Sequence, residues 1–402
     1  MGRGAVPTKA LRSAAGTVPL GLPRGERSED RERIFLAGKN ARLSEGLSRA
    51  SLTIIGQGIE YSHMLKNRLI YIALSAFVSV GLLWILLSQV KPEDVLRTFS
   101  RIFIPALLVY MAVALVAAWL RAWRYKWLLR PQPISWPNMF LVTFIRNSLI
   151  DLLPARLGSL SYIYVLNKRL GFPFETATSS FVLAFVLDFL TISPFLVVSL
   201  IAVGLGANTL STPALLILAA AFFILVFLVY WKLVPVARFF LAFFRGLLRI
   251  GRIEEREAAR TAVQKFELTI QSLDSIRRRG KAIPIFVLSL LVRLAKYISV
   301  FALFFALLRS HGFSISDLNF WTFILGLSGA ELTSAFPIKG LAGFGTWESA
   351  WALTFRLMDF DSRLAIISGI GVHLLTNIFE YSLGIASILI LAWPFFRRKR
   401  TA

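Results

Sequence analysis

Six apolar stretches divide the chain, and each is long enough to cross a membrane as a helix. A spanning helix needs about 20 consecutive apolar residues, because each residue adds about 1.5 Å to a helix and the hydrocarbon core is about 30 Å thick. The pattern therefore predicts an all-α polytopic membrane protein with about six full spans. The six stretches cover residues 69–90, 102–120, 180–204, 212–233, 284–308 and 363–393.

Two further apolar regions, 138–167 and 320–355, are interrupted by charged and helix-breaking residues. The interruptions read FIRNSLIDLLPARLGSL at 144–160 and ELTSAFPIKGLAGFGTWE at 331–348. Irregular backbone at membrane depth persists only where it is buried in protein or lines a cavity. In transporters, paired broken segments of this kind are the best sequence indication of a substrate site. We therefore expect the two interruptions to form a site for a polar substrate.

Lysine and arginine gather in four segments, namely 1–68, 121–130, 236–283 and 394–402. Cytosolic loops carry an excess of these residues, so we expect all four segments, and with them both termini, in the cytosol. This sidedness holds if each interrupted region is a re-entrant helical hairpin. The first hairpin then enters from the cytosol and the second from the outside, so that the two are opposed. A total of 8–10 spans is the alternative, because two full crossings preserve the same sidedness.

The same pattern divides the chain into a transmembrane domain at 69–393 and two basic cytosolic ends at 1–68 and 394–402. The first end lacks the apolar core of a signal peptide and is rich in Arg, Gly and Ser, so we expect a disordered tail. A helix on the lipid surface is the alternative. Within the domain, 236–283 alternates charges with apolar residues at helical spacing. This predicts a cytosolic amphipathic loop, for which a solvated helical connector is an equal alternative.

Composition narrows the partners and the chemistry. Hydrophobic residues make up 56% of the chain and charged residues only 17%, against about a quarter charged in a soluble domain. The net charge of +23 is distributed between apolar spans, so we expect it to face anionic lipid head groups and not nucleic acid. Cysteine is absent and the three histidines are far apart in the sequence. We therefore expect no metal, no cofactor and no catalytic residue, and a homo-oligomer is left open.

The first interruption places Arg146, Asn147, Asp151 and Arg156 at membrane depth. A charge at the bilayer centre costs about 2.5–3.5 kcal/mol, so such residues are candidates for function by default. We predict that Arg146, Asn147 and Arg156 bind substrate, because a planar guanidinium donates two parallel hydrogen bonds to a phosphate. A purely structural pair between Arg156 and either Asp151 or Asp188 is an equal alternative.

The second interruption supplies Lys339, Gly343 and Gly345 as further substrate-binding candidates. Its glycines expose backbone N–H groups at the start of a helix near Thr346, and a helix N-terminus of this kind favours anions. Glu348, in the first turn, either caps this helix or couples charge movement. The helix breakers of the two interruptions are Pro154, Gly158, Pro337 and Gly340.

Acidic residues inside apolar runs are predicted to hold the basic residues in place or to couple their movement to protons. Asp188 lies in the run FVLAFVLDFLTISPF and must face the bundle, where a structural ion pair is favoured over a proton relay. The acidic candidates are Asp151, Asp188, Glu331, Glu348 and Glu380.

Two helical stripes carry further polar residues. Arg293 and Lys296 share a helix face, and for them snorkelling to the cytosolic interface is favoured over attraction of an anionic head group. His373, Asn377 and Glu380 share another face. For these three residues a packed hydrogen-bond network is favoured over a polar lining.

The motifs resemble a known family. The runs NSLIDLLPARLG at 147–158, KRLG at 168–171 and FPIKGLAGFGTWESA at 336–350, together with Asp188, resemble the lysylphosphatidylglycerol synthase transmembrane family, a flippase-like module. The resemblance covers roughly residues 69–393 and implies movement of a phospholipid or lipid-linked sugar between leaflets. The matching positions are Asn147, Pro154, Arg156, Gly158, Asp188, Pro337, Gly343, Gly345 and Glu348.

The chain departs from the family pattern at two places. Where the family often has a Glu after the Arg-x-Gly turn and then an Arg, this chain has Ser159 and residues such as Tyr162. We also expect a stand-alone module, because no aminoacyl-transferase domain follows residue 393.

Together these features lead us to expect translocation of a phospholipid or lipid-linked anionic substrate between the leaflets of the cytoplasmic (inner) membrane. The opposed hairpins would meet near the midplane and the lipid chains would stay in hydrocarbon. Two alternatives stay open. One is a membrane-embedded transferase that uses Asp188 or Glu348 as a base, and the other is a non-catalytic scaffold subunit of the membrane.

Overall fold

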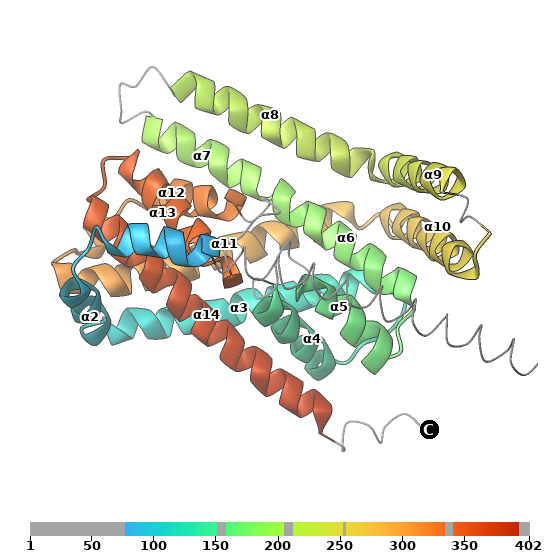
Figure 1. Ribbon diagram of the computed structural model, residues 1–402, viewed down its shortest axis with the longest axis horizontal. Helices are drawn as coiled ribbons and strands as arrows, with labels where there is room; N and C mark the ends of the chain where they lie inside the picture. The colour runs from blue at the N-terminus through green and yellow to red at the C-terminus, as the bar shows by residue number, and fades with distance from the viewer. Residues whose placement is uncertain (1–76, 151–157, 205–211, 252–254, 334–340, 394–402) are drawn as a thin grey trace, which may run out of the picture. The chain divides into compact units, whose positions relative to one another are not determined.

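The computed structural model describes residues 77–150, 158–204, 212–251, 255–333 and 341–393 (Figure 1). All of them lie in the compact unit that runs from Ile72 to Ala402. The described ranges consist of helices joined by turns and contain no β-strand. The predicted all-α class is therefore confirmed.

Several of the predicted spans are long apolar helices in the structure. Within the described ranges, four helical stretches of 25 to 31 residues are long and apolar enough to cross a membrane, and a bent pair of helices makes a fifth candidate. The protein is thus a multi-pass membrane protein. The four stretches are α3 (Ile104–Leu128), α6 (Phe174–Leu190) continued by α7 (Ile192–Gly204), α11 (Ala282–Leu308) and α14 (Ser362–Ala392).

The bent pair consists of α8 (Thr212–Trp231) and α9 (Leu233–Ile250), whose axes meet at 68°. The first predicted span is described only as the shorter apolar helix Phe77–Leu87. The remaining helices and helical turns are α2 (Pro92–Ser100), α4 (Trp136–Leu149), α5 (Ser161–Tyr164), η2 (Val165–Arg169), α10 (Glu257–Arg278), η3 (Arg309–His311), η4 (Ile315–Asp317), α12 (Phe320–Thr333), η5 (Leu341–Gly343) and α13 (Thr346–Arg356).

Local sequence signals set the start of several helices. Ser135 caps α4 by accepting the backbone N–H of Asn138 at 3.5 Å, and Pro137 occupies the first turn, where its missing N–H costs nothing. Asp361 caps α14 in the same way, because its carboxylate accepts the backbone N–H of Leu364 at 2.9 Å. These caps satisfy backbone donors that the first turn of a helix leaves without a partner.

Each interrupted apolar region folds as two short helical arms that contact each other, α4 with α5 and α12 with α13. The arms contain at most 14 residues, which is fewer than the roughly 20 that a full crossing needs. Glycines permit the close approach of the arms: a Cβ at Gly158 would meet the carbonyl of Leu149, and one at Gly326 would meet the ring of Phe355. The described arms of both regions are therefore shorter than a full crossing needs, as re-entrant hairpins require.

The order of elements repeats along the chain. A long helix, a helical hairpin and a second long helix follow one another as α3, α4–α5 and α6–α7, and again as α11, α12–α13 and α14. The long helices α3 and α11 pack against each other along much of their length, and α4 packs against α14. Elements of one half thus contact elements of the other, which brings the two hairpins towards a shared space.

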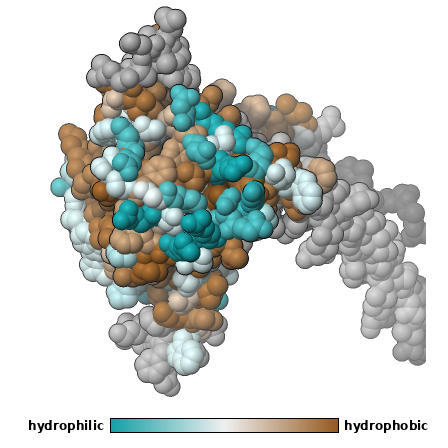
Figure 2. All heavy atoms as spheres, turned by 90° about the vertical axis from the view of Figure 1, so that its left-hand side faces the viewer, coloured by the Kyte–Doolittle hydropathy of each residue, from teal (hydrophilic) through white to brown (hydrophobic). Residues whose placement is uncertain are grey.

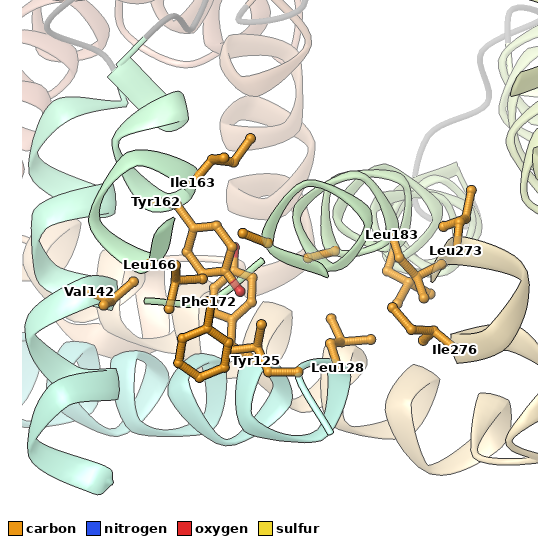
Figure 3. Close-up of a cluster of buried hydrophobic side chains, with 14 of the residues drawn as sticks. Tyr125, Leu128, Val142, Tyr162, Ile163, Leu166, Phe172, Leu183, Leu273 and Ile276 are labelled. Carbon is orange, nitrogen blue, oxygen red and sulfur yellow. The ribbon is translucent and has the colours of Figure 1, made fainter. Parts of the chain in front are cut away.

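A buried aromatic cluster anchors the first hairpin to its neighbours. Tyr125 on α3 and Tyr162 on α5 are fully buried, with ring centroids 4.4 Å apart. Their rings point toward each other, among side chains from α4 and α6 (Figure 3). The Tyr162 hydroxyl also shares a hydrogen bond of 3.0 Å with Ser180 on α6. Tyr162, one of the two departures from the family pattern, is therefore a packing residue of this cluster.

Helices α9 and α10 make up most of the region 236–283 and pack against each other. Large apolar side chains of α9 remain exposed, among them Phe239, Phe243 and Ile250.

At the opposite end of Figure 1 lies α2, which contacts η3. Figure 2 is viewed toward this end and shows a group of hydrophilic side chains with hydrophobic side chains around it. Such a polar surface suits a part of the protein that meets water.

Helix α3 extends further than the hydrophobic pattern indicated. We expected the span to stop at residue 120, but the helix continues to Leu128 and takes up most of the basic segment 121–130. Arg124 is fully buried as a result. Its Nη1 donates a hydrogen bond of 2.7 Å to Oδ1 of Asp188 on α6 and another of 3.2 Å to Ser289 on α11. The Arg124–Asp188 pair therefore links three long helices.

We predict that Gly384→Ala destabilises the protein. A Cβ at this position on α14 would overlap the side chain of Ser148 on α4, and overpacking of this kind costs about 1–3 kcal/mol. The midpoint of thermal unfolding in detergent, followed by tryptophan fluorescence, should fall by several degrees. Gly246→Ala on α9 is the matched control, because a Cβ there meets nothing within 4 Å. Equal midpoints for both variants would contradict the packing of α4 on α14.

We also predict that Asp188→Asn is strongly destabilising. The change leaves the buried guanidinium of Arg124 without its carboxylate, and removal of one member of a buried ion pair costs about 3–5 kcal/mol. Thermal unfolding in detergent should show a large drop in midpoint. Asp359→Asn, which changes an exposed aspartate, should leave the midpoint unchanged. If the two variants unfold alike, the Arg124–Asp188 pair does not hold the helices together.

Candidate functional site

A polar cavity lies between the two halves of the protein. Its volume is about 190 Å³, less than the ~300–1,000 Å³ of pockets that enclose a drug-sized ligand. Both hairpins and the helices α3, α6, α11 and α14 contribute to its wall. The charged and polar lining residues used below are Arg121, Arg146, Asn147, Asp188, Arg293, Lys296, Glu331, Gly343, Trp347, His373 and Glu380.

Asp188 lies at the centre of one wall. Besides its bond to Arg124, its Oδ2 is 3.7 Å from Nη2 of Arg146 on the first hairpin. Its backbone carbonyl accepts a hydrogen bond from Arg293 on α11. The predicted candidate Asp188 thus contacts three arginines, each from a different helix. An intramembrane carboxylate is stabilised by partners of this kind.

Asn147 holds two arginines together on the first hairpin. Its side-chain carbonyl Oδ1 accepts a hydrogen bond of 2.9 Å from Arg121 on α3 and one of 3.3 Å from its neighbour Arg146. Arg146 is 4% exposed and Asn147 8%. Arg121 forms no salt bridge with an acidic residue that the structure describes. The predicted candidates Arg146 and Asn147 therefore come together with Arg121 around one neutral acceptor.

Glu331 forms the centre of a second charged group. Its carboxylate lies 2.5 Å from Nη1 of Arg293 and 2.7 Å from Nζ of Lys296, both on α11. Arg293 is 8% exposed, so the snorkelling interpretation is wrong for this residue. It is buried because the second hairpin supplies a carboxylate at depth, which the spacing within α11 alone could not reveal. The Lys296 side chain remains 40% exposed at the cavity.

Glu348 on α13 is fully buried and has two partners. Its Oε2 accepts the backbone N–H of Gly345 at 2.7 Å, and its Oε1 lies 2.6 Å from Nδ1 of His373 on α14. The first contact caps α13, one of the two roles that the sequence left open. Gly343 and Gly345 have φ angles of 82° and 86°, in the left-handed region that favours glycine. This backbone turns the chain directly before the helix.

The other predicted residues fall into two groups. Glu380 lines the cavity on α14, and Gly158 contacts the backbone of Leu149 as described above. The residues that lie outside the described ranges are Asp151, Pro154, Arg156, Pro337, Lys339 and Gly340. Their predicted roles stay predictions.

The sequence reasoning missed Arg121 in the cavity wall and Arg124, the buried partner of Asp188. Arg121 and Arg124 were assigned to a basic cytosolic segment, although they continue the helical register of the preceding apolar run. For His373 a packed network was favoured over a polar lining; the residue is 7% exposed, contacts Glu348, and also lines the cavity. Within the described ranges, no group of three His, Cys, Asp or Glu residues could hold a metal ion.

A comparison of the sequence with protein families shows to which family the chain belongs. The chain matches the family model described as "Lysylphosphatidylglycerol synthase TM region" over residues 72–384, which include every residue of the cavity wall named above. No curated protein and no solved structure matches the chain. The match covers most of the chain and agrees with the family that the motifs at 147–158 and 336–350 resembled. The chain therefore belongs to the family of the lysylphosphatidylglycerol synthase TM region.

Proposed function

We propose that this protein translocates a phospholipid, or a lipid-linked anionic substrate, between the leaflets of the cytoplasmic membrane. The observation that carries this proposal is the convergence of Arg121 and Arg146 on Oδ1 of Asn147 in the cavity wall. Family membership supports a function related to membrane lipids. The step from that general function to translocation is our inference from the site.

The charges of the wall favour an anionic ligand. Among the described lining residues, four are basic (Arg121, Arg146, Arg293 and Lys296) and three are acidic (Asp188, Glu331 and Glu380). Among the described residues, the carboxylate of Asp188 pairs with Arg124 and Arg146, and that of Glu331 pairs with Arg293 and Lys296. Arg121 and Arg146 in addition share the neutral amide oxygen of Asn147. Two neighbouring guanidinium groups disfavour each other's charge. A phosphate bound between them would offset this repulsion through charge-assisted hydrogen bonds.

The size and exposure of the cavity suit a head group rather than a whole lipid. Its volume of about 190 Å³ leaves no room for acyl or prenyl chains. The side chains of Lys296 and Asp188 are 40% and 24% exposed, so both present surface that a bound head group could contact. The lipid chains would remain in hydrocarbon beside the exposed apolar surface of the spanning helices. Anionic lipid at the cytosolic surface would meet the basic residues of α9 and α10.

Substrate transfer would use both hairpins. The head-group phosphate would contact Arg121, Arg146 and Asn147 on one side and approach Lys296 on the other. Arg156 and Lys339, predicted from the sequence, are further candidates for this path. Asp188 and Glu331 would keep the basic side chains oriented, because each carboxylate already contacts two of them.

We predict that Arg121→Gln slows leaflet exchange at least about tenfold, because a hydrogen bond from a charged donor contributes about 1.5–3 kcal/mol. The change removes a positive charge without leaving a described carboxylate unpaired. The assay is dithionite quenching of fluorescent phospholipids and prenyl-phosphate lipids in proteoliposomes that contain the purified full chain. Arg146→Gln should have the same effect.

The matched control is Arg260→Gln on α10, where the arginine is exposed and lies outside the cavity wall. It should exchange lipid at the wild-type rate. Absence of exchange by folded wild-type protein with every lipid would overturn the proposal. New lipid products detected by mass spectrometry would then favour the transferase, and unchanged lipids would favour the scaffold.

A further inference from the structure

A buried carboxylate–imidazole pair joins the second hairpin to the cavity wall. Glu348 Oε1 and His373 Nδ1 are 2.6 Å apart, and the glutamate is fully buried. Its other oxygen accepts the N–H of Gly345, a backbone donor that cannot turn away. An ionised carboxylate only accepts hydrogen bonds, so Oε1 accepts from the histidine. This contact makes Nδ1 a donor and leaves Nε2 as the ring atom that can gain or lose a proton.

The ring of His373 lines the cavity, and its Nε2 edge lies beside Gly343. It lies against Phe344 and Trp347, with centroid distances of 4.6 and 4.9 Å. A Cβ at Gly343 would come within 3.5 Å of Nε2 and 3.3 Å of Cε1, and Gly343 and His373 both line the cavity. No described residue forms a hydrogen bond with Nε2. Gly343, whose φ angle is positive, thus lies beside this edge without a side chain that would cover it.

We propose that Nε2 of His373 is a proton-binding site whose occupancy is coupled to the anion in the cavity. The inference rests on the proposed function. One proton passes from water in the cavity to the Nε2 lone pair, and the neutral imidazole becomes an imidazolium. Release to water on the other side of the membrane reverses the step, and no other bond forms or breaks. The anionic head group and the proton then cross with no net charge between them.

The surrounding charges give the coupling its sign. Glu348 offsets a positive charge on the ring, whereas the basic residues of the wall oppose it. An anion in the cavity reduces that opposition, so anion binding favours proton binding. By linkage, the proton also favours the anion by the same factor. The ionisable groups that face His373 across the cavity are Tyr110, Arg121, Arg146, Asp188, Arg293, Lys296, Glu331 and Glu380.

Trp347 provides a direct test that does not depend on transport. An imidazolium stacked on an indole quenches its fluorescence, and the His373 and Trp347 rings are stacked at 4.9 Å. The Trp347 signal is the difference in emission between the wild-type full chain and Trp347→Phe, measured in detergent across the pH range in which histidine titrates. We expect quenching on acidification with a single midpoint. Addition of short-chain phosphatidylglycerol should move this midpoint to higher pH.

Two variants assign the signal. Glu348→Gln should change the midpoint, because it removes an opposite charge in direct contact with the ring. His373→Gln should remove the pH dependence of the Trp347 emission. A Trp347 signal that does not change with pH in the wild type, or that titrates alike in wild type and His373→Gln, would overturn the proposal. So would a midpoint that is insensitive to the lipid, since this result shows no coupling to the anion.

Leaflet exchange under a pH gradient separates this inference from the proposed function. If wild type exchanges lipid and the gradient accelerates it, while folded His373→Gln exchanges at one rate with or without the gradient, both proposals stand. If wild type exchanges lipid at the same rate with and without the gradient, the proton site is overturned and the proposed function stands. A lipid-sensitive Trp347 titration without exchange of any lipid would uphold the coupled proton site and overturn translocation.

Discussion

The ion pair between Arg124 and Asp188 is the constraint on which the arrangement of the helices depends. A fully buried guanidinium is tolerated only where a carboxylate and other acceptors surround it. Asp188 on α6 and Ser289 on α11 supply these acceptors at 2.7 and 3.2 Å, so α3, α6 and α11 must meet at this depth. Because Asp188 also contacts Arg146, the same requirement positions the first hairpin. The polar cavity forms beside this group of charges.

The two hairpins bring charge to depth in a way that full spans do not. A helix that crosses the bilayer satisfies all its backbone groups internally and exposes apolar side chains, whereas a short arm ends within the protein and leaves backbone groups for side chains to satisfy. On the second hairpin, Glu348 accepts the N–H of Gly345 at such an end and contacts His373 with its other oxygen. A single carboxylate thus completes the fold of the hairpin and orients a side chain of the cavity.

Much of this architecture could be predicted from the sequence, because its strongest signals are local. Apolar run length revealed the long helices, and proline, glycine and charge at 144–160 and 331–348 revealed the hairpins. Asp188 stood out as one charge in an apolar run. The arginines on α3 did not, because Arg121 and Arg124 follow an apolar run and resemble the basic flank of a span. Only the facing carboxylate on α6 and amide on α4 distinguish them from such a flank, and these partners are distant in the sequence.

The partner of Arg293 and Lys296 on α11 was missed for the same reason, because it is distant in the sequence. Arg293 and Lys296 would snorkel if α11 faced only lipid, but Glu331 meets both of them and keeps them at the cavity. Among the described residues, carboxylates thus contact the basic residues on α11 and Arg146, while Arg121 and Arg146 also share the amide oxygen of Asn147. A monoanionic group bound beside Asn147 would offset the repulsion between these two guanidinium groups. Binding strength in the cavity would follow the charge of the head group, with the identity of the lipid chains secondary.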